Sequence, residues 1–513
     1  MKFTLAIFLH FIFYTASFCQ ELYKTEEKVS SIELTRSKGS NVEILESFNS
    51  EIEGQKFNFI LRRESIVGDK DRKVSYVIDK FSEPFAYQKS LDITEVFDGL
   101  EVKSKSFYPG KPEVQIIMNG KTAFIFNHSI IDGKYLLHAH TANLITMELG
   151  ERKNLIRMDI NEKRKVKHAY IEVSGNGEYV GLVLLPKDVD YIDKNTLFKV
   201  YNADFDLLYS KKNEVAGDIF AFTKERFNLN SKGEICLLGA YKRAKINKDT
   251  TEILDNEDSV YFGGFYHRLP DLWLTTEINV VKHVDGDTVT YAAFHKDEDK
   301  ICRKIDFLKY NIATNELFSR NTSKSGPNVN YVLGLELLKD EEGDYFLIGA
   351  RKYIVNDFFL NNKNRVGSTW YLGNIWVAKI SGEGSLIFKK QIQREYEGGF
   401  GHLKHVLVTM SEGKIYCLYR DTKRGLRVEK DKTQFNLTMP GTNVLNAYGL
   451  GVVNPFGKVS RYQLDIDLKR NSILVGVPFI NRFVSLPKGG FVYLPKQNDL
   501  RLGICNLSLI KLP

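Results

Sequence analysis

One short pattern recurs along the chain and limits what it can fold into. In Leu337–Gly349, an apolar run leads into an acidic turn with Gly343, and the apolar run Tyr345–Ile348 follows. Branched and aromatic residues favour strands, and glycine can take the positive φ that a tight turn needs. The segment therefore predicts a β-hairpin. Similar segments place their turn glycines at these positions: Gly54, Gly133, Gly177, Gly233, Gly286, Gly343, Gly413 and Gly489.

Each hairpin is followed by another apolar strand, a turn and a more polar strand, as in Asn374–Ile392. The period is roughly 60 residues, with connections of variable length. Four antiparallel strands per unit, repeated in tandem, are typical of a β-propeller. We therefore predict an all-β chain and a propeller of four-stranded antiparallel blades. Eight copies indicate eight blades. Seven is the alternative, because the copies at Gly54 and Gly286 are the poorest and the last unit is truncated.

The two ends of the repeat region suggest how the ring closes. The last unit has three clear strands, and its fourth is only the stub Ile510–Pro513. Before the first unit, Ser31–Thr35 alternates apolar and polar residues, as a strand with one buried face does. We therefore assign residues 48–513 to the propeller and residues 20–47 to an N-terminal segment that can supply the closing strand.

Residues 1–19 differ from the rest of the chain. A basic start, an apolar core from Phe3 to Phe13 and small residues near Cys19 predict a signal peptide that is cleaved before Gln20. An uncleaved anchor and lipid attachment at Cys19 are the alternatives. No other apolar run is long enough to span a membrane. We expect an exported protein, either secreted or located in the periplasm or at the cell surface.

The charge of the chain argues against binding to nucleic acid. The formal net charge is +8 in 513 residues, and residues of both signs are interspersed. The richest basic runs, Lys163–Lys167 and Lys423–Arg427, lie in predicted connections and lack interleaved aromatic residues. A nucleic-acid surface needs a concentrated basic stripe. We interpret both runs as solvated loops.

Four cysteines remain after residue 19: Cys236, Cys302, Cys417 and Cys505. The repeat places them in different units, so their Cα atoms are not expected within the roughly 7 Å that a disulfide tolerates. We predict buried free thiols that pack as small apolar residues. No Cys/His spacing typical of zinc appears, and no cofactor motif is present, so we predict neither a metal nor a cofactor.

Ligands of propellers usually bind to the loops at one end of the channel, and the sequence offers candidates there. His138 and His140 end a predicted second strand, where alternate residues share a face and can approach a metal or an anion together. The sequence shows no third ligand, and a polar strand end explains the pair more simply. We therefore name both histidines as binding candidates without predicting a metal.

The connection around Glu397–His405 supplies four further binding candidates. Its three glycines permit a close approach of the backbone to a ligand, and aromatic and basic side chains stand among them. A tight crossing between blades is the simpler interpretation. The candidates are Phe400, His402, Lys404 and His405. A third segment, Gly263–Trp273, is rich in aromatic residues but is predicted at the opposite end of the channel.

The pattern of residues 330–392 resembles the tandem units of secreted bacterial β-propeller proteins, in which a strand ending in V-x-K-I/L-x-x-x-G leads to a polar strand. The resemblance implies the fold and no activity, since propellers include both enzymes and binding proteins. We predict no catalytic residues, because no nucleophile or metalloprotease motif appears. Our first hypothesis is a monomeric, non-catalytic protein that binds a protein or glycan partner. The alternatives are a glycoside hydrolase or lyase and a structural component of a cell-surface assembly.

Overall fold

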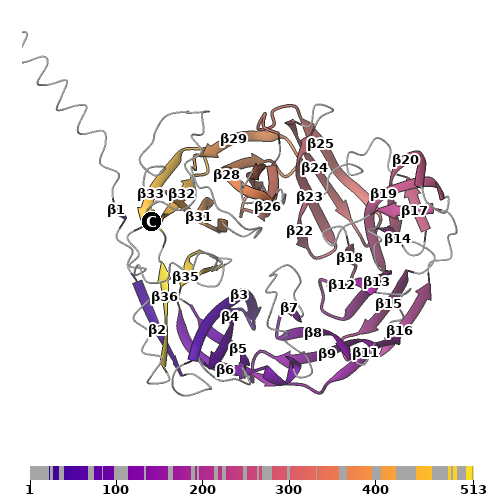
Figure 1. Cartoon of the computed structure of the whole chain (residues 1–513), viewed down its shortest axis with the longest axis horizontal. Helices are drawn as coiled ribbons and strands as arrows, with labels where there is room; N and C mark the ends of the chain where they lie inside the picture. Colours follow the sequence, from indigo (N-terminus) through magenta and orange to yellow (C-terminus); the bar gives the residue numbers. More distant parts are fainter. Residues whose placement is uncertain are drawn as a thin grey trace, which may run out of the picture.

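The computed structural model shows strands arranged in sheets that form a ring (Figure 1). Within the described residues there are eight sheets and one 3-10 helix, η1 (Thr94–Phe97). No helix in this part of the chain is long and apolar enough to cross a membrane. The structure describes these residues: 22–23, 27–33, 40–66, 74–83, 85–97, 114–131, 134–159, 166–186, 191–192, 196–212, 218–221, 227–246, 251–262, 265–268, 280–296, 301–330, 332–357, 367–394, 406–422, 446–464, 483–486, 489–493, 504–510 and 512.

We number the sheets 1 to 8 in chain order. The strands of sheets 1 to 4 have these bounds: β3 (Ser40–Ile52), β4 (Gln55–Ile66), β5 (Val74–Ser82) and β6 (Ala86–Asp92) in sheet 1; β7 (Val114–Asn119), β8 (Thr122–Ile131), β9 (Lys134–Asn143), β10 (Glu148–Leu149) and β11 (Lys153–Asp159) in sheet 2; β12 (Val166–Val173), β13 (Tyr179–Pro186), β15 (Leu197–Asn202) and β16 (Leu207–Lys212) in sheet 3; β14 (Tyr191–Ile192), β17 (Asp218–Ala221), β18 (Phe227–Leu229), β19 (Ile235–Ile246), β20 (Thr251–Phe262) and β21 (Phe265–Arg268) in sheet 4.

The strands of sheets 5 to 8 have these bounds: β22 (Val281–Asp285), β23 (Thr288–Lys296), β24 (Cys302–Asn311) and β25 (Glu316–Ser323) in sheet 5; β26 (Val332–Lys339), β27 (Tyr345–Asp357), β28 (Gly367–Ile380) and β29 (Leu386–Ile392) in sheet 6; β30 (Val406–Ser411), β31 (Lys414–Thr422), β32 (Asn446–Val453), β33 (Val459–Leu464) and β1 (Leu22–Tyr23) in sheet 7; β34 (Phe483–Ser485), β35 (Phe491–Tyr493), β36 (Ile504–Ile510) and β2 (Glu27–Glu33) in sheet 8.

The expectation of eight uniform blades, or of seven, is wrong. Among the described residues, six sheets are regular blades, in which one stretch of chain winds four antiparallel strands in order; these are sheets 1, 2, 3, 5, 6 and 7. Sheet 4 has six strands, because β14 joins it from an earlier connection and both β17 and β18 pair with β19. Sheet 8 combines three strands from the end of the chain with one from its beginning. The repeat period could not reveal either departure, because it does not show which connections pair as extra strands.

Sheet 8 brings the two ends of the chain together. Strand β2 lies antiparallel to β36, with Ile32 opposite Cys505. It overlaps the alternating segment Ser31–Thr35, which the sequence singles out as a closing strand. The preceding strand, β1, pairs in parallel with β33 of sheet 7. The N-terminal segment therefore adds a strand to each of two neighbouring sheets.

Sheet 6 shows how the residues of one repeat build a blade. Gly343 takes a φ of 90° in the turn between β26 and β27. The side chains of β27 alternate between two cores: Phe346 and Ile348 pack with Cys417 of sheet 7, whereas Leu347 packs with Phe307 of sheet 5. Each such buried side chain contributes about 1.5–3 kcal/mol. Both faces of this strand are therefore apolar, as expected for a strand covered on both sides.

The cysteine prediction is confirmed for the three thiols that the structure describes. Cys236, Cys302 and Cys417 are buried free cysteines on strands of sheets 4, 5 and 7. Cys236 and Cys417 belong to separate apolar clusters. Burial raises the pKa of the Cys417 thiol to about 12. These thiols thus pack as neutral apolar groups.

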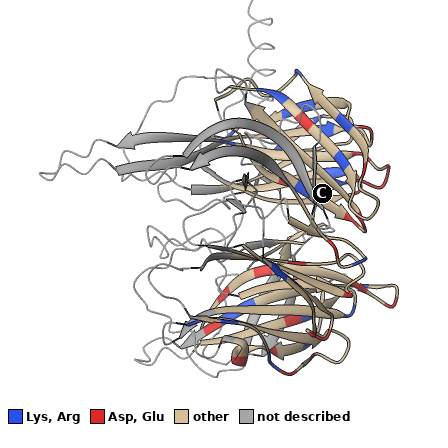
Figure 2. Ribbon diagram, turned by 90° about the vertical axis from the view of Figure 1, so that its right-hand side faces the viewer, with Lys and Arg blue, Asp and Glu red and all other residues tan. Residues whose placement is uncertain are grey.

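Tight turns at one end of the ring join neighbouring sheets through hydrogen bonds. Asp and Glu residues gather in these turns, whereas Lys and Arg lie mainly along the strands (Figure 2). The contacts from one sheet to the next are Ser50 Oγ to the Gly120 carbonyl, Asn119 Nδ2 to the Ser174 carbonyl (3.0 Å), Asn176 Nδ2 to the Ser231 carbonyl (3.2 Å), the Ser231 N–H to Asp287 (2.7 Å) and Lys339 to Asp285 (2.5 Å). Sheets 1 to 6 are therefore linked around the ring at this end.

Candidate functional site

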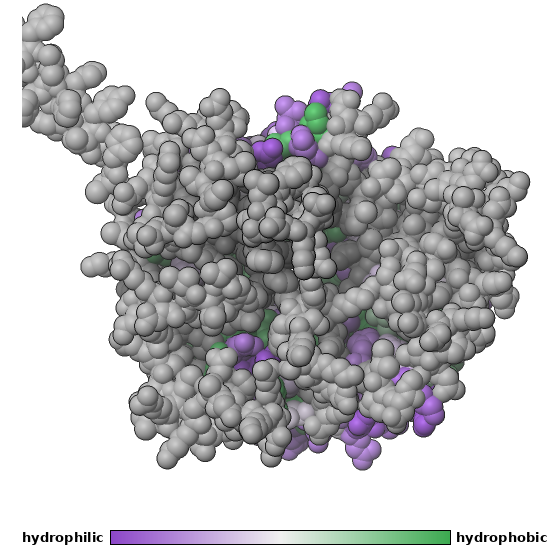
Figure 3. All heavy atoms as spheres, in the orientation of Figure 1, coloured by the Kyte–Doolittle hydropathy of each residue, from purple (hydrophilic) through white to green (hydrophobic). Residues whose placement is uncertain are grey.

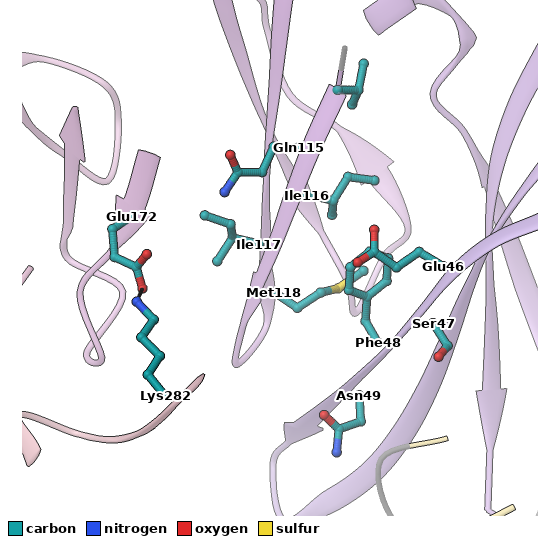
Figure 4. A pocket seen from close by; sticks show the side chains of 11 residues that line it. Glu46, Ser47, Phe48, Asn49, Gln115, Ile116, Ile117, Met118, Glu172 and Lys282 are labelled. Carbon is teal, nitrogen blue, oxygen red and sulfur yellow. Dashed lines mark hydrogen bonds and ion pairs between the residues drawn. The ribbon is translucent and has the colours of Figure 1, made fainter. Parts of the chain in front are cut away.

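A cavity of about 530 Å³ lies between the inner strands of several sheets, and we call the space that these strands surround the channel. Strand β3 supplies Glu46–Asn49 and strand β7 supplies Val114–Met118; Glu172 of β12 and Lys282 of β22 complete the lining (Figure 4). All four strands lie at the inner end of their sheets. Figure 3 shows hydrophobic residues in small patches toward the inside of the ring and hydrophilic residues at its lower right rim. The cavity thus lies where innermost strands of several sheets converge.

Successive side chains of strand β7 point to opposite sides, so they give the cavity two kinds of wall. Gln115 and Ile117 point toward Glu172 and Lys282 (Figure 4). Gln115 donates a hydrogen bond from Nε2 to the Ile171 carbonyl at 3.3 Å, which ties β7 to β12. On the opposite side, Ile116 and Met118 pack with the core between sheets 1 and 2. One wall is therefore polar and the other is apolar.

Lys282 links three successive sheets at the cavity. Its ammonium group lies 3.1 Å from Glu172 Oε1 and donates to the Phe227 carbonyl at 2.9 Å and to Asn228 Oδ1 at 3.3 Å. An ammonium group has three donors, and these contacts use all three. The side chains of Lys282 and Glu172 keep 18% and 22% of their surface exposed. The pair thus fixes the inner strands and still presents polar atoms to the channel.

A second charged cluster lies wholly inside sheet 1. Arg62 Nε lies 2.6 Å from Asp79 Oδ2, and the same guanidinium forms an ion pair with Glu64; all three side chains are fully buried. Ser90 donates to Asp79 at 2.5 Å. Burial raises the pKa of Asp79, and the nearby Arg62 opposes that rise. Because water cannot reach these groups, we interpret the cluster as structural.

Three carboxylates in sheet 6 resemble a cation site, but a lysine already occupies their centre. Asp340, Glu342 and Asp344 lie within ligand distance of one another in the turn after β26. The Lys379 ammonium lies 3.2 Å from Asp340, 3.4 Å from Glu342 and 3.1 Å from Asp344. It also lies 5.4 Å from the centre of the Phe346 ring. The lysine therefore supplies the counter-charge and ties the turn to β28.

The structure places His138 and His140 differently from the sequence prediction. Both lie in β9, the third strand of sheet 2, because the turn between its first two strands is at Gly120 and not at Gly133. Both histidines are buried on the face opposite Ala139, which packs toward sheet 3. Burial lowers the pKa of each imidazole, so both are neutral at pH 7. They are not part of the channel cavity.

The other candidates lie outside the described residues. These are Phe400, His402, Lys404 and His405, together with residues 1–19. Of the segment Gly263–Trp273, the structure describes only residues 265–268, which form strand β21.

Sequence reasoning missed the residues that line the cavity. The signal for Lys282 was present, because a lysine interrupts the apolar alternation of an inner strand just before Gly286. Strand β7 was missed because the hairpin after it, with Gly133 in its turn, matched the repeat better than its own turn at Gly120.

No family model matches the sequence, and no curated protein is similar to it. Among solved structures, the β-propeller domain of the Trilobed protease from Pyrococcus furiosus has a TM-score of 0.36 and 10% identity, and the match covers 86% of this chain and all of that domain. The WD40 domain of SCAP from fission yeast has the same score and identity, with coverage of 94% and 98%. At this level of similarity neither match carries an argument, so the fold assignment rests on the topology of this chain's own sheets.

Proposed function

We propose that this chain is an exported, non-catalytic binding protein that takes a segment of a protein partner into the cavity of its channel. The observation that carries this proposal is the mixed lining of the cavity between β3 and β7. Ligand sites are typically apolar and contain a few placed polar groups. Ile116, Ile117 and Met118 supply the apolar surface, whereas Asn49 and Gln115 supply amide groups that pair well with a peptide backbone.

The lining favours a peptide over a glycan. Sugar rings are usually bound by stacking on aromatic side chains. Of the described residues that line the cavity, Phe48 is the one aromatic. In addition, the innermost strand of a sheet has one edge without a neighbouring strand, and an extended peptide can pair with such an edge. Among the described strands, β7 pairs with β8 alone and therefore offers this edge.

The charges of the cavity favour binding over glycoside hydrolysis. A glycosidase needs one carboxyl group to protonate the leaving oxygen and a second to attack or to activate water. Two glutamates line the cavity, Glu46 and Glu172. Glu172 is engaged by Lys282 in the tie between three sheets, so it is positioned as part of an ion pair. This arrangement supports recognition and not acid–base catalysis.

A screen of displayed peptides and of a glycan array against the exported chain tests the proposal. We expect peptide ligands whose binding is weakened at least tenfold by Phe48→Ala and by Ile117→Lys, because both changes alter the lining. Phe456→Ala is the matched control, since Phe456 lies in the turn after β32 and is 90% exposed. Selection of glycans alone, or hydrolysis of a glycan, would contradict the proposal and favour the carbohydrate-active alternative.

Export has a separate test. We expect the mature protein in the culture medium or the periplasmic fraction, with an N-terminus at Gln20. Recovery of the chain only in the cytoplasm, or with residues 1–19 retained, would show that export is wrong without affecting the binding proposal.

A further inference from the structure

Two hydrogen-bond acceptors between sheets 1 and 2 are buried and lack a donor. Among the described residues, His138 Nε2 and Asn127 Oδ1 have no hydrogen-bond partner. The two residues are 5% and 2% exposed, and they lie directly opposite each other on β9 and β8. A buried polar atom without a partner costs about 1–3 kcal/mol. Because the two residues are paired across β8 and β9, their partnerless atoms indicate an occupant that supplies a positive or electron-accepting atom.

The hydrogen bonds made by the two imidazole rings show which nitrogen of each ring carries the proton and which has a lone pair. His138 Nδ1 lies 2.6 Å from Asn154 Oδ1, and His140 Nδ1 lies 3.1 Å from the Gly150 carbonyl. Both partners are acceptors, so each Nδ1 carries the proton and each Nε2 has a lone pair. An oxygen acceptor on the remote nitrogen is the usual arrangement behind a metal-bound histidine. Since the histidines are two residues apart on one strand, both rings are on the same face of sheet 2.

The two rings have different charged neighbours. The η1 residue Glu95 attracts the protonated form of His140, whereas Arg152 repels the protonated form of both histidines. The amide of Asn127 is oriented by donation from its Nδ2 to the Val96 carbonyl in the same 3-10 helix. This bond leaves Oδ1 of Asn127 as the atom available to an occupant. The donor set on one face is thus two imidazole nitrogens and one amide oxygen.

We propose that His138, His140 and Asn127 bind a divalent transition metal ion of the zinc type between sheets 1 and 2. Imidazole nitrogen suits zinc, copper and nickel, and an oxygen ligand with a water molecule completes a four-coordinate site. The site is separate from the channel cavity. It ties the third strand of sheet 2 to the side of sheet 1 that η1 covers, and its role is to stabilise this junction.

Titration of the metal-free chain with Zn²⁺, followed by thermal unfolding, tests this site. We expect one equivalent of Zn²⁺ to raise the unfolding temperature, and Co²⁺ to give the visible absorption of a four-coordinate nitrogen and oxygen complex. His138→Gln and His140→Gln should each weaken metal binding at least tenfold. His283→Gln is the matched control, because burial also lowers the pKa of this partly buried histidine and it lies on β22 of sheet 5.

The titration has two outcomes that would overturn the proposal. One is the absence of any Zn²⁺-dependent shift and of any Co²⁺ absorption, which would mean that a water molecule alone satisfies the two acceptors. The other is an equal response in the wild type and in both histidine variants, which would place the metal elsewhere. If a variant fails to fold, Asn127→Asp provides the second measurement: a carboxylate at this position should tighten Zn²⁺ binding.

Discussion

Two groups of charged side chains have different surroundings: the ion pair of Glu172 and Lys282 at the cavity, here called the channel pair, and the buried ions of sheet 1, here called the sheet 1 cluster. Glu172 and Lys282 keep about a fifth of their surface exposed and face the cavity. Arg62, Glu64 and Asp79 have no exposed surface and lie within one sheet. A partly exposed ion pair contributes little to stability because water screens it. A buried one is costly to break because the remaining charge loses its partner in a medium of low polarity.

This difference separates charges that hold the fold from charges that are available to a ligand. The sheet 1 cluster cannot meet a solute without unfolding, whereas the channel pair can exchange contacts at its exposed side. The cluster that Lys379 forms with Asp340, Glu342 and Asp344 in sheet 6 is intermediate in exposure, since Asp340 is 6% exposed and Glu342 is 78% exposed. The three clusters therefore define a series in which the effect on stability should fall as exposure rises.

Arg62→Met should have the largest effect on stability. The change leaves Asp79 and Glu64 buried without their cation, and breaking a buried ion pair in this way costs about 3–5 kcal/mol. Urea unfolding followed by circular dichroism measures the loss. The triple variant Arg62→Met, Glu64→Gln, Asp79→Leu removes the stranded charges and should recover most of it. A loss below about 1 kcal/mol in the single variant would show that water reaches the cluster.

Lys379→Met should have the second largest effect, about 2–3 kcal/mol, because Asp340 and Asp344 then repel each other across the turn at Gly343. The same unfolding experiment measures it. Glu342→Gln is the control: this carboxylate is mostly exposed, and its loss should change stability by less than about 0.5 kcal/mol. Equal losses of stability in Lys379→Met and Glu342→Gln would contradict the expectation that the effect falls as exposure rises.

Acidification should destabilise the protein through His138 and His140. Burial lowers the pKa of both imidazoles below the unfolded value of about 6.5. Between the folded and the unfolded pKa, the unfolded chain binds more protons, so stability is complete above roughly pH 7.5 and falls as the pH decreases. Chemical unfolding at pH 7.5 and pH 5.5 measures this slope. In the double variant His138→Gln, His140→Gln, the free energy of unfolding should change less between the two pH values. An unchanged pH dependence would show that other groups cause it.

Lys282→Met should have the smallest effect on stability, about 1 kcal/mol or less, since its ion pair is partly exposed. Its effect on ligand affinity should be the larger one, about tenfold, because the polar wall of the cavity loses its ammonium group. Thermal unfolding and peptide binding are measured on the same preparation. A loss of stability as large as that of Arg62→Met, with unchanged affinity, would make the channel pair a structural feature only.

The repeat predicted many of the strands and tight turns well, because a turn glycine and an apolar run are local signals, but the number of blades and the turn assigned to Gly133 were wrong. Gly343 between β26 and β27, and Gly413 between β30 and β31, lie where the pattern placed them. The sequence could not reveal that Tyr191–Ile192 would join sheet 4, because such a pairing depends on the path of a connection. It also could not bring Glu172 and Lys282 together, since that contact joins residues 110 positions apart.

The most direct test of the binding proposal is the methyl NMR spectrum of the methionines during titration with the best peptide of the screen. Met118 lines the cavity, whereas Met158 lies on β11 at the outer side of sheet 2. We predict that the Met118 signal shifts in proportion to the bound fraction and that the Met158 signal stays in place. A peptide that binds with full affinity while the Met118 signal stays unchanged would contradict the proposed site.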